Sequence, residues 1–179
     1  MKKLLLLVAV LFVATTSFAQ EWSVGGRIGS GFQALGQYNY NSSSYVEARF
    51  GMSWNNPKFT TVLTNGDGII NDVRESRVMA EFAILHNWHV LDMDWTPRAG
   101  MWFFDAGVGV GVGGRSHYAY VGVAGLLRLG FEFNNAPVTI AVDYSPIIGT
   151  ATHYGKHYSN TAFNDLGMAN LGISCTYNF

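Results

Sequence analysis

Apolar and polar residues alternate with a period of two along most of the chain after residue 20. Successive side chains of a β-strand point to opposite faces, so this period predicts strands with one apolar face and one polar or small face. The clearest apolar faces are Val46, Ala48, Phe50, Met52 and Trp54; Trp102, Phe104, Ala106, Val108, Val110 and Val112; Val121, Val123, Leu127, Leu129, Phe131 and Phe133; and Val138, Ile140, Val142 and Tyr144.

The alternating segments, and the turn-forming residues between them, predict eight strands. Most of these segments have about the 9–11 residues that a tilted strand needs to cross a bilayer. The segment 59–65 alternates least clearly. The expected fold is all-β, a transmembrane up-and-down antiparallel β-barrel in which the last strand pairs with the first, since an open edge would leave backbone groups unpaired in hydrocarbon. The predicted strands are 21–33, 44–54, 59–65, 78–93, 101–113, 118–133, 137–145 and 165–179.

The composition favours contact with lipid through strand faces. Aromatic residues make up 15% of the chain and charged residues only 13%, about half the usual charged share. Beyond the first 20 residues, no apolar run is long enough for a transmembrane helix. We therefore expect a chain this apolar to contact a membrane through the apolar faces of its alternating strands.

The first residues have the pattern of an export signal. Lys2 and Lys3 precede an unbroken apolar run at 4–13, and small residues at Ser17 and Ala19 mark a signal-peptidase site. The apolar run is shorter than the roughly 20 residues of a membrane anchor. We expect a signal peptide at 1–19 and one barrel domain at 20–179. Loss of the two lysines changes the formal net charge from −1 to −3, which does not favour a nucleic-acid partner.

The connections predict which way the barrel faces. Short turns, "NNPK", "DWTPRAG" and "NNAP", follow the second, fourth and sixth predicted strands. Longer connections, "ALGQYNYNSS", 65–77 and 146–164, follow the first, third and seventh, and "GRSH" is a short exception. Short periplasmic turns and longer outer loops are typical of transmembrane barrels. The expected aromatic girdle at the short-turn rim is Trp22, Trp54, Phe59, Trp102, Phe104, Phe131, Phe133, Tyr177 and Phe179, with Phe32, Tyr118, Tyr120 and Tyr144 at the other rim.

The polar faces carry a nearly balanced set of charges. An eight-stranded barrel is just wide enough for side chains to fill it, and unpaired charges there would be costly. We expect a structural network of paired charges that plugs the lumen, with room for larger side chains opposite the glycines at 107, 109, 111 and 113. Its members are Arg27, Glu47, Arg49, Asp105, Arg128, Glu132 and Asp143.

Other motifs do not predict a cofactor, a metal site or a catalytic centre. The glycines at 109, 111 and 114 match a dinucleotide fingerprint, but no helix is expected after them. The stretch 63–74 has calcium-loop spacing but lacks the first Asp and the last Glu. The remaining candidates are His86 and His89, on opposite strand faces; His153 and His157, without a third ligand; and Ser116 and His117, adjacent only in sequence.

The chain resembles the small eight-stranded outer-membrane barrels of Gram-negative bacteria, of the OmpA/OmpX-like kind. The resemblance rests on the export signal, the strand rhythm and the terminal "CTYNF", and phrases such as "WFFDAGVGVGVGG" and "NNAPVTIAVDYSP" are similar to porin-like barrel proteins. It implies an outer-membrane location, and barrel assembly machinery and periplasmic chaperones as partners. Tyr177 and Phe179 would be the aromatic positions of the assembly signal, and Ser174 departs from the glycine common in such signals.

Three functions remain open at this point. The first is a non-enzymatic integral outer-membrane protein with a plugged lumen, which has a structural role or contacts an extracellular ligand through its outer loops. The second is a narrow channel for ions or small solutes. The third is a soluble lipocalin-like barrel with a ligand inside. The sequence favours the membrane because each strand has a continuous apolar face and carries its charges on the other.

Overall fold

The structure, a computed structural model, describes residues 21–54, 59–60, 72–73, 78–96, 98–115, 118–154, 159–164 and 170–179. The predicted signal peptide lies outside these residues. No helix in the described part of the chain is long and apolar enough to cross a membrane. The strands are β1 (Trp22–Gly29), β2 (Gly31–Asn41), β3 (Ser44–Ser53), β4 (Phe59–Thr60), β5 (Asp72–Val73), β6 (Met79–Met93), β7 (Gly100–Arg115), β8 (Tyr118–Phe133), β9 (Val138–Tyr144), β10 (Ile147–Tyr154), β11 (Ser159–Asn164) and β12 (Leu171–Asn178).

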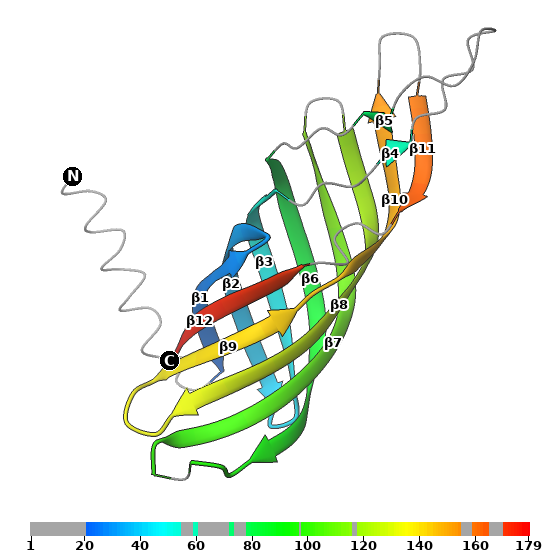
Figure 1. Cartoon of the computed structure of the whole chain (residues 1–179). Coiled ribbons are helices and arrows are strands. Elements are labelled where there is room, and N and C mark those ends of the chain that lie inside the picture. Colours follow the sequence, from blue (N-terminus) through cyan, green and yellow to red (C-terminus); the bar gives the residue numbers. More distant parts are fainter. Residues whose placement is uncertain are drawn as a thin grey trace, which may run out of the picture.

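Eight of these strands form a closed antiparallel ring. Its order is β1, β2, β3, β6, β7, β8, β9 and β12, and β12 pairs again with β1 (Figure 1). Neighbours in the ring follow one another along the chain, so the barrel is of the up-and-down type. The predicted fold class is confirmed.

A bend between β9 and β10 extends one side of the barrel. Pro146 has no N–H to donate to a ladder, and its carbonyl instead accepts a hydrogen bond from the Gly125 N–H at 2.8 Å. Beyond the bend, β10 continues along β8 and pairs on its other side with β11. The long strands β6, β7 and β8 rise with them past the ring (Figure 1).

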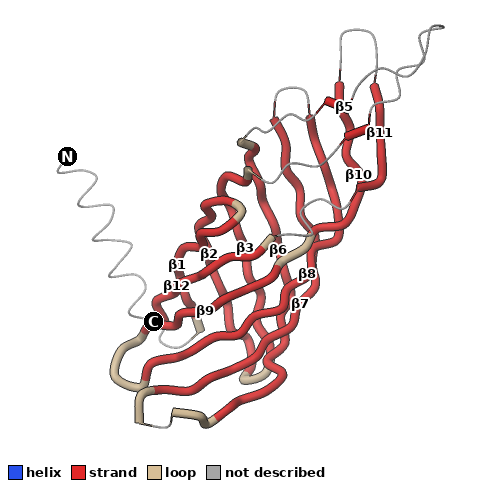
Figure 2. Tube along the Cα trace, viewed as in Figure 1, coloured by secondary structure: helices blue, strands red, loops and turns tan. Residues whose placement is uncertain are grey.

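The two ends of the barrel differ in their connections. One end, the turn end, holds the turns at 42–43 and 134–137, the turn residues 94–96 and 98–99, and the strand ends Trp22 and Asn178 (Figure 2). The other end, the loop end, holds the turn at Ser30 and the points where the chain leaves β3, β7 and β10. The Trp54 N–H donates to the Ser30 carbonyl at 2.9 Å, which places Trp54 at the loop end.

The first predicted strand, 21–33, is wrong as a single element. The chain reverses at Ser30, and the predicted loop "ALGQYNYNSS" continues as β2. Glycine flanks the reversal on both sides, and a Cβ at Gly29 or Gly31 would lie about 2 Å from a backbone carbonyl oxygen of the neighbouring strand, that of Leu171 in β12 or Met52 in β3. Leu35 and Gln37 are buried in β2 while Tyr38 and Tyr40 are exposed, so the period of two was present within a stretch rich in turn-forming residues.

The described part of the predicted third strand, 59–65, does not pair with the ring. Phe59–Thr60 pairs with β5 in a separate two-stranded sheet, and the stretch 61–65 lies outside the described residues. Strand β2 takes this place in the ring, so β3 runs opposite to the expected direction and ends at the loop end, before "NNPK" in the sequence. The predicted loop 146–164 is also wrong in part, since β10 and β11 form a hairpin there.

The aromatic side chains lie partly as expected. At the turn end, ring contacts join Trp22 with Tyr38, Trp102 with Phe131, Phe131 with Phe133, and Tyr177 with Phe179. Trp54 instead lies at the loop end. Tyr118 and Tyr120 lie at the start of β8 near the loop end, as expected, but they face inward and are 2% and 6% exposed, so they do not belong to an outward aromatic belt.

The interior has an apolar part and a polar part. The apolar cluster fills the half near the loop end, where inward side chains of β6, β8 and β10 meet. Most buried polar groups occupy the middle of the ring and the turn end, and Ser53, Glu81 and Asn170 are buried near the loop end. The cluster consists of Met79, Ala83, Leu85, Tyr118, Tyr120, Ala124, Leu126, Ile147 and Ala151.

Candidate functional site

A network of charged side chains crosses the middle of the barrel. Six of the seven residues singled out from the sequence are buried there, each at most 3% exposed: Arg27, Glu47, Arg49, Asp105, Arg128 and Asp143. The seventh, Glu132, lies outside the network at the turn end, exposed to solvent, where Asn178 Nδ2 donates to its Oε1 at 3.3 Å.

Glu47 is the centre of one half of the network. Its carboxylate receives Arg128 Nη1 at 2.7 Å and Gln37 Nε2 at 2.6 Å, and it also binds Arg49 Nε. Glu47 and Arg49 are two residues apart on β3, so both side chains point inward. One fully buried carboxylate therefore contacts two buried guanidinium groups.

Arg27 and Asp143 form the other half. Arg27 Nε lies 2.6 Å from Asp143 Oδ1, and Arg27 Nη2 donates to the carbonyl of Asn170 at 3.2 Å. A Cβ at Gly172 would lie 2.5 Å from the Arg27 guanidinium carbon, so glycine leaves the room for this side chain. Asp143 Oδ2 also lies 3.9 Å from Arg128 Nη2, which joins the two halves.

Glu81 is a member that sequence reasoning missed. Its Oε1 accepts a hydrogen bond from Gln33 Nε2 and its Oε2 accepts one from the Tyr120 hydroxyl at 2.7 Å. The Gln33 side chain also lies near Arg27. The alternation in β6 is weak because its inward side chains include the apolar residues Met79 and Leu85. Glu81 lies among these apolar inward neighbours, so the sequence pattern does not mark it as a residue of the lumen.

We expect Tyr120→Phe to destabilise the barrel by about 1–3 kcal/mol, because it leaves a buried Glu81 oxygen without its donor. The control is Tyr38→Phe, which removes a hydroxyl from a ring on the outer surface. The measurement is the free energy of unfolding in urea for protein refolded in detergent. Equal stability of the two variants would show that the Tyr120 hydroxyl does not support the network.

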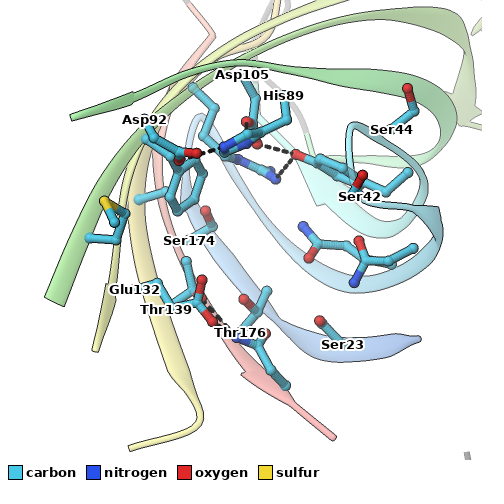
Figure 3. Close-up of a pocket in the computed structure, with 18 of the residues that line it drawn as sticks. Ser23, Ser42, Ser44, His89, Asp92, Asp105, Glu132, Thr139, Ser174 and Thr176 are labelled. Carbon is cyan, nitrogen blue, oxygen red and sulfur yellow. Dashed lines mark hydrogen bonds and ion pairs between the residues drawn. The ribbon is translucent and has the colours of Figure 1, made fainter. Parts of the chain in front are cut away.

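A chain of hydrogen bonds connects the network to the turn end (Figure 3). Arg128 Nη1 donates to the Tyr45 hydroxyl at 2.9 Å, and that hydroxyl donates to Asp105 Oδ2 at 2.7 Å. His89 Nδ1 lies 2.8 Å from Asp105 Oδ1, and His89 Nε2 lies 2.6 Å from Asp92 Oδ1. Since the Asp92 side chain is 58% exposed and that of Asp105 is 3% exposed, the chain runs from solvent into the barrel.

A pocket of about 750 Å³ opens inside the barrel at the turn end. Its floor includes Arg128, Asp105 and Tyr45 from the network, and Glu132 and Asp92 also line it. The polar wall comes from inward positions of β1, β2, β3, β9 and β12. Figure 3 shows hydroxyl groups of β1, β3, β9 and β12 around the space. The size is within the range of small-molecule sites.

Some buried polar atoms have no hydrogen-bond partner in the described part of the chain. They are Nη2 of Arg49, Nε and Nη2 of Arg128, Oδ2 of Asp143 and both amide atoms of Asn87. Asn87 is completely buried, and a Cβ at Gly107 would collide with its Oδ1. The network is therefore paired in charge but has hydrogen-bonding capacity left.

The other candidate residues that lie in the described part of the chain are not brought together. No group of three or more His, Cys, Asp and Glu side chains suited to a metal occurs among the described residues. His86 points outward, bonded to Tyr40 and in ring contact with Trp88, while His89 points inward. The side chain of His153, the residues His157, Ser116 and His117, and most of the stretch 63–74 lie outside the described part of the chain.

Comparison of the chain with protein-family models, curated proteins and solved structures gave no match. The class of protein is defined here by the fold alone: an eight-stranded, closed, antiparallel β-barrel with a charged interior.

Proposed function

We propose that the chain is an integral outer-membrane β-barrel protein that is not an enzyme and does not conduct ions. In this proposal it is exported by its signal peptide and inserts with the turn end toward the periplasm. The connections at the loop end then lie at the cell surface, where they have a structural role or contact an extracellular ligand. The observation that carries the proposal is the composition of the outer surface.

The outer surface of the ring is apolar on every strand. Among the described residues, no Asp, Glu, Lys or Arg occupies an outward position within the eight ring strands, and many outward side chains are large and well exposed. Val123, Phe50 and Ile173 are examples, at 57%, 64% and 60% exposed. A soluble protein rarely exposes a continuous apolar area beyond a few hundred Å², whereas a membrane barrel requires an apolar band around its circumference.

The inside supports the membrane proposal over a lipocalin-like barrel. A soluble ligand-binding barrel has polar residues outside and an apolar cavity inside. Here Arg27, Glu47 and Asp143 are buried in the middle of the lumen, and the outer face is apolar. The resemblance of the sequence to OmpA/OmpX-like barrels agrees with this polarity.

The arrangement of the lumen argues against a channel. The ion pairs of Glu47 with Arg49 and Arg128, and of Arg27 with Asp143, cross the barrel between the turn-end pocket and the apolar cluster. Breaking such a buried pair is costly, so ions passing the network would have to displace side chains that hold the barrel together.

Fractionation of cells that express the full chain tests the location. We expect the protein in the outer-membrane fraction, with an electrophoretic mobility that changes only after boiling, because a closed ladder resists unfolding in detergent. Refolded protein in a planar bilayer should show no conductance steps. Recovery from the soluble periplasm would favour the lipocalin-like alternative, and steady conductance would favour the channel.

A further inference from the structure

The pocket at the turn end has features of a binding site that the proposed membrane role does not require. A plugged lumen needs only paired charges, yet about 750 Å³ remains open between the network and the solvent. The pocket lies inside the closed ring, so its properties do not depend on whether the outer face meets lipid. From its lining we propose that it binds a saccharide ring, neutral or carrying an amine.

The wall offers hydroxyl groups that are available to a ligand. Ser23, Ser44 and Ser174 come from β1, β3 and β12 and line the pocket from different sides. In Figure 3 no hydrogen bond joins these hydroxyls to the other lining residues drawn. A hydroxyl group both donates and accepts a hydrogen bond, as do the hydroxyls of a sugar, so each can pair with the other in either direction.

The floor is polar but carries no isolated charge. Arg128 lines the pocket together with Tyr45 and Asp105. Arg128 Nη1 lies 2.7 Å from Glu47 and donates to the Tyr45 hydroxyl at 2.9 Å, and that hydroxyl donates to Asp105. A ligand oxygen at the floor therefore meets paired polar groups without an isolated positive charge.

Aromatic and apolar side chains supply a surface for the apolar face of a sugar. Phe103 lines the pocket, with its ring 5.6 Å from that of His89. Gly130 makes room for this ring, since a Cβ there would lie 2.1 Å from Phe103 Cζ. Phe179 and Met101 line the pocket as well. A purely polar ligand would leave these side chains facing water.

The charges at the mouth select against anionic ligands. Asp92 and Glu132 line the pocket and are exposed to solvent. Asp92 is paired with His89, and Glu132 accepts a long hydrogen bond of 3.3 Å from Asn178. The mouth is therefore acidic, so an amine is favoured and a carboxylate is disfavoured.

The test is calorimetric titration of protein refolded in a sugar-free zwitterionic detergent, since glycoside detergents would compete. The probes are glucose, glucosamine and glucuronate, which share a ring and differ in charge. We expect saturable binding of glucosamine and glucose with Kd values on the order of 1–10 mM, and weaker binding of glucuronate. Absence of saturable binding for glucose and glucosamine up to roughly 50 mM, or tightest binding of glucuronate, overturns the proposal.

Glu132→Gln tests the selectivity with little risk to folding, because the side chain is exposed. It should weaken glucosamine binding by about two- to fivefold and change glucose binding by a smaller factor, because glucose carries no charge for the carboxylate to attract. The matched control is Asp94→Asn, which removes an exposed carboxylate that does not line the pocket. If both variants change glucosamine binding equally, the preference reflects the overall charge and the site assignment is wrong. Cell fractionation tests the proposed membrane role separately, so the two proposals fail independently.

Discussion

Glu47→Gln is expected to lower the free energy of unfolding by about 3–5 kcal/mol, the range found when one partner of a buried ion pair is removed. Glu47 is completely buried and binds both Arg49 and Arg128. Glutamine keeps the size and one carbonyl oxygen but removes the charge, so two guanidinium groups remain in the lumen with one carboxylate fewer. The measurement is equilibrium unfolding in urea of protein refolded in lipid vesicles.

Two further variants separate this effect from a general loss of negative charge. Glu132→Gln removes an exposed carboxylate and should change stability by no more than about 0.5 kcal/mol. The double variant Glu47→Gln with Arg49→Gln should be less destabilised than the sum of the two single variants, because it removes both members of one pair. Additive losses, or a loss below about 1 kcal/mol for Glu47→Gln alone, would contradict the network as a structural element.

The closed barrel was predictable because the period of two recurs along most of the chain, and because turn-forming residues separate the alternating segments. A period of two assigns alternate residues to opposite faces of a strand, whatever the exact residue at which the strand begins. The burial of Asp105 and the exposure of Val108 and Val110 on β7 therefore follow from the sequence alone. The charged residues on the polar faces also predicted six of the side chains that meet in the lumen. Neither inference needed the exact pairing of strands.

The pairing was less predictable because turns and strands use the same small residues. The reversal at Ser30 occupies a single residue between two glycines, in a segment that reads as one strand. The stretch after it contains Asn and Ser, which favour turns, although Leu35 and Gln37 keep the alternation. An error in one strand reversed the expected direction of β3 and moved Trp54 to the opposite end.

The pocket and the hydrogen-bonded chain through His89 could not be predicted from the sequence. Asp92, His89, Asp105 and Tyr45 meet because β3, β6 and β7 are neighbours in a particular register. An irregularity in the pairing between His89 and Leu91 shifts that register locally. A bulge of this kind changes which side chains point inward, and alternation alone gives no sign of it.

The apolar outer face gives the prediction that separates membrane from soluble barrels most directly. Val123 lies near the middle of β8, between Val110 of β7 and Ile148 of β10, and is 57% exposed. If that face meets hydrocarbon and position 123 lies near the midplane of the bilayer, Val123→Arg should destabilise the barrel by about 2–4 kcal/mol. On a soluble barrel the same arginine would be solvated, and the change would be within about 0.5 kcal/mol.

The measurement is the free energy of unfolding in vesicles for Val123→Arg and for Asn135→Arg, which places the same side chain in the exposed turn between β8 and β9. The control corrects for the added charge and for any effect of arginine on the unfolded chain. Because Val123 points away from the lumen, its replacement leaves the ion pairs inside untouched. A large loss at 123 with none at 135 therefore reports lipid contact, and equal tolerance at both positions would mean that this face of β8 lies in water.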